Sequence, residues 1–150
     1  MRKGAVPAMR PGRIIGHEAV RTVTEGGAGV KNSRVGDRVL VSCVTACGAC
    51  RYCREGHFGQ CLGGGGWILG NEIDGTQAEF VRVPFADGWT YPVPSGGRVA
   101  VLLLLADILP TACEVGVIEG KLRRARVTVA VRPCTVGHSR HTTAHLFSPR

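Results

Sequence analysis

Short apolar stretches separated by glycine and proline run along most of the chain, and this pattern predicts a mainly β protein with short helices. In residues 35–42 (VGDRVLVS) a Gly-Asp turn precedes apolar, β-branched residues, so a strand is expected there. Side-chain classes alternate over residues 76–83, which predicts another strand. The apolar run 127–131 (VTVAV) predicts a further, buried strand.

Residues 99–116 are the best helix candidate, and Pro110 is expected to break that helix because proline removes a backbone donor. Residues 1–13 are polar and rich in proline and glycine, which predicts an irregular lead-in. The longest apolar run, residues 99–106, has eight residues, whereas a membrane span needs about 20, so no membrane partner is expected. No apolar segment typical of a signal peptide follows Arg2 and Lys3.

Four of the seven cysteines fall in one short segment: Cys47, Cys50, Cys53 and Cys61. Their spacing lets four thiolates converge on one tetrahedral ion, with zinc–sulfur distances of about 2.3 Å. Two alternatives stay open, namely unrelated thiols or disulfides, and an iron–sulfur cluster. Zinc is favoured over iron because ferredoxin motifs have a shorter last spacing and a following proline, whereas Leu62 follows Cys61 here. Four thiolates leave no ligand position open, so the motif predicts a structural site.

The net charge of +8 is unevenly distributed along the chain. Residues 121–150 contain seven basic residues and no acidic one, so the basic character belongs to this last segment. A nucleic-acid surface is one interpretation, but the segment has no regular basic helix face and Phe147 is its only aromatic residue, so nucleic acid is an unlikely partner. Many cysteines without secretory features favour metal binding in a reducing compartment, the cytoplasm.

Taken alone, the pair His17-Glu18 is weak evidence for a metal site, because His17 could be an ordinary surface histidine or a hydrogen-bonded core histidine. In context, however, Gly16-His17-Glu18 resembles the G-H-E-x-x-G signature of zinc-dependent medium-chain alcohol dehydrogenases. The sequence at 35–39 resembles the V-G-D-R-V strand of that family, and the cysteine spacing is similar to its structural-zinc lobe. Residues 67–71, 74–81 and 106–111 also look like family segments, so the resemblance covers roughly residues 11–120.

The resemblance implies a GroES-like, partly open β-barrel in residues 1–120, with a zinc lobe at about 43–66. Residues 121–150 would be a degenerate start of a Rossmann-like nucleotide-binding domain, contributing only its first strand, or an irregular basic tail. The implied reaction converts a small alcohol to an aldehyde or ketone with zinc and NAD(P)+ as cofactors. By motif, His17 and Asp107 match ligands of the catalytic zinc, and Glu18 matches a carboxylate near that metal. A homo-oligomer is possible.

Three departures from the family pattern limit this prediction. The sixteen residues before His17 contain no cysteine, so one ligand of the catalytic zinc is absent from these 150 residues. Arg21 stands at a glycine position of the signature, a poor fit if that position needs glycine's backbone freedom. The sequence 132–137 (RPCTVG) replaces the glycine-rich turn that would bind the dinucleotide.

These departures leave the enzymatic status of the chain open, and a truncated fragment that is inactive alone is expected. The alternatives are a non-enzymatic structural zinc-binding protein and, less favoured, a basic zinc module that binds nucleic acid or protein.

Overall fold

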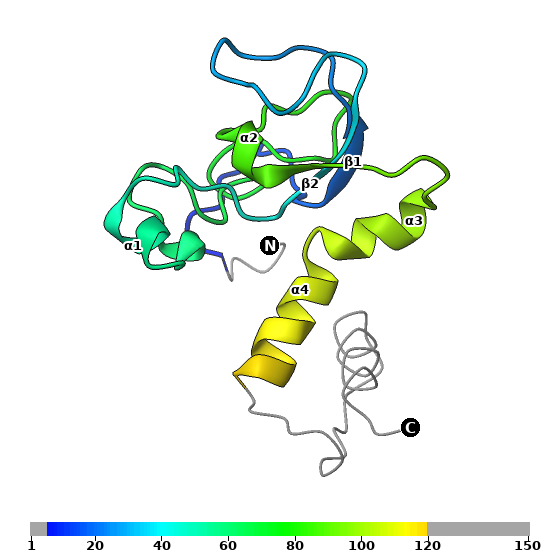
Figure 1. Ribbon diagram of the computed structural model, residues 1–150. Coiled ribbons are helices and arrows are strands. Elements are labelled where there is room, and N and C mark those ends of the chain that lie inside the picture. Colours follow the sequence, from blue (N-terminus) through cyan, green and yellow to red (C-terminus); the bar gives the residue numbers. More distant parts are fainter. Residues whose placement is uncertain (1–5, 120–150) are drawn as a thin grey trace, which may run out of the picture. The chain divides into compact units, whose positions relative to one another are not determined.

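The computed structural model describes residues 6–119, which fall into two compact units that meet in sequence at Leu103 and Leu104 (Figure 1). The first unit contains an antiparallel sheet with the strand order β1–β2–β3, formed by Ala19–Thr22, Arg38–Val41 and Thr90–Pro92. In this sheet Val20 pairs with Leu40, and Leu40 in turn pairs with Tyr91. The described part of the chain is therefore built on a small open sheet with long loops, as the GroES-like prediction expects.

The strand β2 lies at the centre of the sheet, and the turn before it explains why it forms. Gly36 has a φ of +95°, a conformation that glycine adopts without strain. The carboxylate of Asp37 accepts a hydrogen bond from the backbone N–H of Arg34 at 2.7 Å, which closes the turn. The apolar residues that follow then enter the core, where Val41 packs with Ala19 and Leu69. The strand predicted in residues 35–42 is thus confirmed.

The strand predicted in residues 76–83 is wrong, because these residues are irregular. The backbone N–H groups of Thr76 and Gln77 donate to the carbonyls of Gly16 and Ile15, at 2.9 and 3.0 Å, but no such bonds are described for residues 78–83, so no ladder continues along the segment. Val81 and Val83 still pack against the core, which explains the apolar positions in the pattern.

The described helices are all short, and none is long and apolar enough to cross a membrane. They are α1 (Arg51–Arg54), η1 (Phe58–Gln60), α2 (Ala86–Trp89), α3 (Val99–Leu102), η2 (Leu103–Leu105), α4 (Ile108–Cys113) and η3 (Glu114–Ile118).

The helix predicted over residues 99–116 is interrupted, but not at Pro110. The interruption falls at residues 106–107, and Pro110 lies in the first turn of α4. A proline is tolerated there because a backbone N–H in the first turn has no partner within the helix. The predicted strand at 127–131 and the remainder of the segment 121–150 lie outside the described residues.

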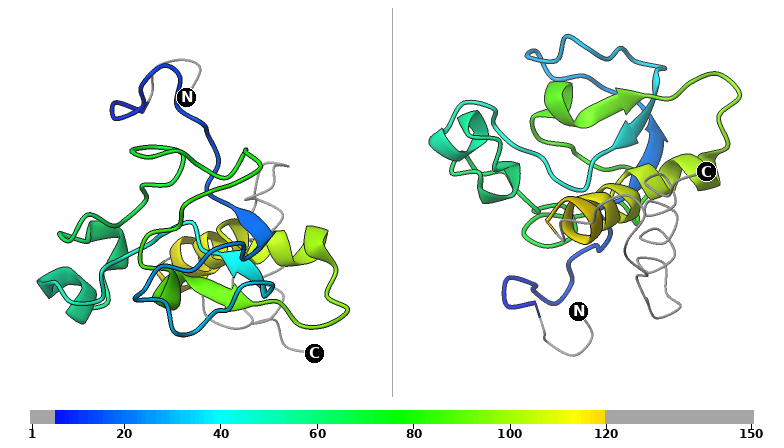
Figure 2. Two further views of the ribbon diagram at one scale, coloured as in Figure 1. Left: turned by 90° about the horizontal axis from the view of Figure 1, so that it is seen from above. Right: turned by 60° about the horizontal axis from the view of Figure 1, so that its bottom comes forward.

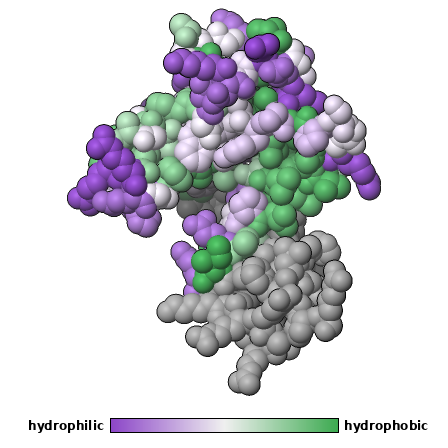
Figure 3. Space-filling model, in the orientation of Figure 1, coloured by the Kyte–Doolittle hydropathy of each residue, from purple (hydrophilic) through white to green (hydrophobic). Residues whose placement is uncertain are grey.

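The segment that carries α1 projects away from the sheet in both views of Figure 2. The outer tip of this projection is hydrophilic (Figure 3), and Arg51, Arg54 and Glu55 are exposed there. Arg51 and Glu55 form an ion pair at 3.6 Å. The position of this segment corresponds to the zinc lobe predicted at about 43–66.

Leu69 is completely buried in the core of the first unit, whereas Leu62 is 71% exposed. We predict that Leu69→Ala lowers the free energy of unfolding by about 2–5 kcal/mol, through lost burial and the cavity left behind. The matched control Leu62→Ala is expected to change it by less than about 0.5 kcal/mol. Urea denaturation monitored by circular dichroism measures both, and equal effects would contradict the core described here.

Candidate metal centre

Within the first unit, the two ends of the cysteine loop lie side by side at a narrow point, the neck, which consists of residues 45–47 and 63–66. Thr45 and Gly66 form an antiparallel bridge there. The backbone N–H of each residue donates a hydrogen bond to the carbonyl of the other. The indole Nε1 of Trp89 donates to the carbonyl of Ala46 at 2.7 Å. Phe58 packs edge-on against Trp89 with ring centroids 4.9 Å apart. Protein contacts therefore fix the base of the loop.

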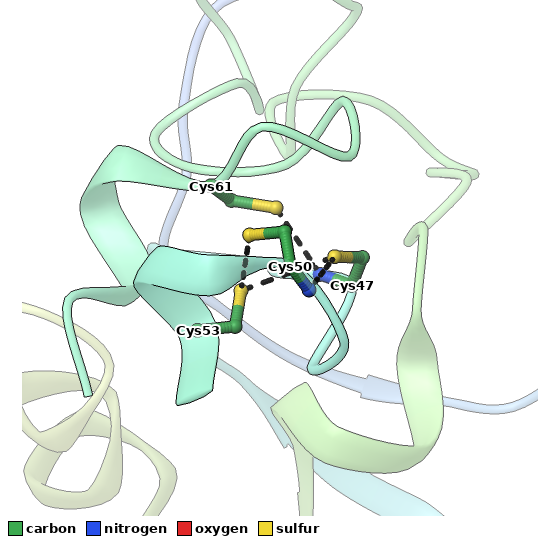
Figure 4. A group of neighbouring side chains, drawn as sticks. All are labelled: Cys47, Cys50, Cys53 and Cys61. Atoms are coloured by element: carbon green, nitrogen blue, oxygen red, sulfur yellow. Dashed lines mark hydrogen bonds between the residues drawn. The ribbon is translucent and has the colours of Figure 1, made fainter. Parts of the chain in front are cut away.

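Local helical structure brings two of the thiols together. Cys50 is the N-cap residue of α1 and Cys53 lies within the helix, so one turn places both on the same face. Cys47 precedes this turn and Cys61 follows η1, and the four Sγ atoms converge (Figure 4). All four lie within 4.8 Å of one another.

The distances between these sulfur atoms suit a tetrahedral zinc ion. The Sγ atom of Cys53 lies 3.4 Å from that of Cys50 and 3.9 Å from that of Cys47. Four sulfurs at about 2.3 Å from a tetrahedral centre would be separated by about 3.8 Å. Both distances are close to this value, so the four cysteines fit such an ion.

Backbone N–H groups point at the sulfur atoms and stabilise their ionised form. The N–H of Cys47 and that of Gly63 both donate to the Sγ of Cys61, each at 3.3 Å. The N–H of Cys50 donates to the Sγ of Cys47, and the N–H of Leu62 donates to the Sγ of Cys50, each at 3.4 Å.

These surroundings separate the acidities of the thiols. The backbone N–H groups of Cys53 and Leu62 lower the pKa of Cys50 from 9.0 to about 6. The backbone N–H of Cys47 lowers the pKa of Cys61. Burial, followed by the neighbouring Cys50 side chain, raises the pKa of Cys53 to about 12. These opposite shifts favour ionisation of Cys50 before Cys53, and metal binding must release the protons that the ligand thiols still carry.

His57, which lies inside the cysteine loop, is exposed and is the N-cap residue of η1. It is not part of the four-sulfur cluster.

His17 and Glu18 immediately precede β1 and are half-buried. The imidazole of His17 packs edge-on against Trp67, with ring centroids 5.6 Å apart. The carbonyl of Glu18 accepts a hydrogen bond from the hydroxyl of Thr76 at 2.9 Å. These contacts fix the backbone and ring of the His-Glu pair within the first unit.

Asp107 belongs to the second unit, where it is the half-buried N-cap residue of α4. The backbone carbonyl of Asp107 accepts a hydrogen bond from the N–H of Thr111 at 2.9 Å. The carboxylate Oδ1 of Asp107 accepts a second hydrogen bond from the Thr111 hydroxyl. His17 and Asp107 therefore occupy different units, and their joint role as ligands of a catalytic zinc stays a prediction.

Arg21, which stands at a glycine position of the signature, lies within β1 opposite Val39. Its φ is not in the left-handed range, so the position makes no demand that only glycine meets. Its guanidinium donates to the carbonyls of Thr76 and Val20, at 3.2 and 3.4 Å. The fold accommodates this departure from the family pattern.

Residues 1–95 match the family model described as the alcohol dehydrogenase GroES-like domain. The chain is 41% identical over 110 residues to zinc-type alcohol dehydrogenase B of Aspergillus flavus, a match covering 73% of this chain and 25% of that protein. It is 38% identical over 127 residues to a glutathione-independent formaldehyde dehydrogenase of Pseudomonas aeruginosa, covering 73% of this chain and 30% of that protein.

Solved structures show the same similarity. Zinc-dependent alcohol dehydrogenase 2 from Streptococcus pneumonia superposes with a TM-score of 0.89 at 42% identity, covering 98% of this chain and 41% of that chain. An alcohol dehydrogenase from Thermus sp. ATN1 gives a TM-score of 0.82 at 32% identity, covering 97% and 42%.

The fold and the cysteine cluster thus define a GroES-like domain with a candidate zinc lobe. The chain belongs to the zinc-type alcohol dehydrogenase family. It spans 25% to 30% of the length of the two curated relatives above.

We predict that Cys50 in the metal-free protein reacts with iodoacetamide at neutral pH, because its pKa is lowered to about 6 and the thiolate is the nucleophile. Cys53, whose pKa is raised to about 12, is expected to react only in strongly alkaline solution. Peptide mass spectrometry across a pH series measures the alkylation rate of each cysteine. If both rates rose with the same pH midpoint, near the ordinary pKa of cysteine, the predicted difference between the two thiols would be contradicted.

Proposed function

We propose that this chain supplies the zinc lobe and part of the alcohol-binding side of an NAD(P)+-dependent alcohol dehydrogenase. The substrate would be a small alcohol, oxidised to an aldehyde or ketone. The observation that carries the proposal is the convergence of four Sγ atoms within 4.8 Å inside a GroES-like domain. The names of the relatives support the reaction class.

Cys47, Cys50, Cys53 and Cys61 are proposed to hold a structural zinc ion. Four thiolates complete its tetrahedron, so no ligand position is left for substrate. The lobe would therefore contribute stability rather than chemistry, with metal binding coupled to the folding of the loop.

His17 and Asp107 are proposed as ligands of a catalytic zinc, with Glu18 beside it. That ion would supply Lewis-acid polarisation of the alcohol oxygen. Packing against Trp67 restricts the ring of His17, and the Thr76 hydroxyl restricts the backbone at Glu18. Fixed orientations of this kind are what a metal-ligating histidine and its neighbouring carboxylate need. The hydride acceptor would be NAD(P)+, and we assign none of residues 6–119 to its binding.

A second candidate function is a non-enzymatic zinc-binding role for these 150 residues. The separate assembly of the cysteine site favours it, because all four thiols come from one loop and require nothing from His17 or Asp107. Binding of nucleic acid or protein through residues 121–150 remains the less favoured alternative, and that segment lies outside the described residues.

We predict that the protein purified from zinc-supplemented medium retains about one zinc ion per chain, in the four-thiolate site, because the catalytic zinc lacks one expected ligand within these 150 residues. Cys61→Ser should lose this zinc, because it removes a ligand that three other thiols cannot replace. His17→Ala should retain it and serves as the control. Inductively coupled plasma mass spectrometry gives the stoichiometry, and equal zinc in wild type and Cys61→Ser would contradict the structural site. A wild-type value near two that falls to one in His17→Ala would instead support metal recruitment by His17.

The 150-residue chain is expected to show no alcohol-dependent reduction of NAD(P)+, because these residues lack one expected zinc ligand and the glycine-rich cofactor turn. Absorbance at the NAD(P)H band, recorded with several small primary and secondary alcohols, measures this. The Cys61→Ser variant provides the background rate. Turnover of the wild type clearly above that background would show that this chain is an enzyme by itself.

A further inference from the structure

The run of four glycines that ends the cysteine loop, residues 63–66, has a specific packing role. Gly66 forms the bridge with Thr45, and the segment before it runs past residues 45–47 on the other side of the neck. A Cβ atom on Gly65 would lie 2.7 Å from the Cα of Ala46. The two sides of the neck are therefore in direct backbone contact.

Gly63 makes the contact that matters most for the metal site. A Cβ atom on this residue would lie 2.6 Å from the Sγ and 2.7 Å from the Cβ of Cys47, and 3.7 Å from the Sγ of Cys61. The first two distances are shorter than any that packed carbon and sulfur atoms adopt, because interiors are close-packed at van der Waals contact. A side chain at position 63 can thus be accommodated only if Cys47 or the backbone of residue 63 moves.

The backbone conformation of Gly63 does not itself require glycine, because its φ lies outside the left-handed range. The need is for space against a thiol. In addition, the N–H of Gly63 donates to the Sγ of Cys61 at 3.3 Å. This one residue therefore contacts two of the four sulfurs, one through its Cα face and the other through its backbone donor.

We propose that Gly63 is a positioning residue of the zinc site, which sets the location of the Cys47 thiolate by offering no side chain to it. This inference rests on the proposed zinc binding by the four cysteines. It assigns a role to a residue that is not itself a ligand. It also implies that protein contacts at the neck, together with the ion, determine the positions of the ligand sulfurs.

The test compares Gly63→Ala with Gly59→Ala in the metal-free full chain. Gly59 lies in η1 within the same loop, has no positive φ, and a Cβ there would meet no atom within 4 Å. Zinc affinity is measured by competition with a chromophoric chelator. We expect Gly63→Ala to weaken zinc binding roughly tenfold or more, a loss typical of residues that orient metal ligands. Gly59→Ala should match the wild type.

The absorption spectrum of bound cobalt(II) provides a second measurement, which a general loss of protein stability would not change. The energies and intensities of its d–d bands report the coordination geometry, so Gly63→Ala should shift these bands at saturating cobalt while Gly59→Ala leaves them unchanged.

Unchanged zinc affinity and an unchanged cobalt spectrum in Gly63→Ala would overturn the role of Gly63 while leaving the zinc site intact. If the wild type bound neither metal, the proposed function itself would fail. The two failures are therefore distinguishable.

Discussion

Four sulfur atoms within 4.8 Å of one another form a demanding arrangement, because thiolates at such distances repel each other strongly. The metal-free protein relieves this repulsion in two ways: Cys53 retains its proton, and backbone N–H groups point at the sulfurs that ionise. A divalent cation relieves it more completely. The chemistry of the whole loop follows from this one requirement, since each contact around the thiols either holds them together or offsets their charge.

The neck connects this requirement to the sheet. Trp89, at the end of α2 and directly before β3, donates to the carbonyl of Ala46, while β3 pairs with β2. The loop is thus anchored to an element whose register is set by the core around Val41 and Leu69. Because this anchor does not depend on an ion, the fold reduces the ordering cost that metal binding must meet.

The cysteine cluster could be predicted from the sequence because its geometry is mostly local, with one helical turn joining Cys50 to Cys53. The irregular path of residues 76–83 could not, because alternating side-chain classes do not reveal that the backbone bonds to Gly16 and Ile15, some 60 residues earlier, stop at Gln77 in the described structure. Gly63 shows a different limit. A glycine run indicates backbone freedom, whereas the structure leaves no space for a side chain at Gly63 or at Gly65. Only the contacts across the neck, with Cys47 and Ala46, distinguish these two meanings.

The bridge between Thr45 and Gly66 has an architectural consequence, because the chain enters and leaves the lobe at adjacent points. An insertion of this kind behaves as a cassette: its length and content can vary between proteins while the register of the surrounding strands stays the same. The lobe could be shortened to a simple turn, or replaced by an unrelated hairpin, provided that the two sides of the neck kept their spacing. The cysteine loop and the three-stranded sheet can therefore change largely independently during evolution.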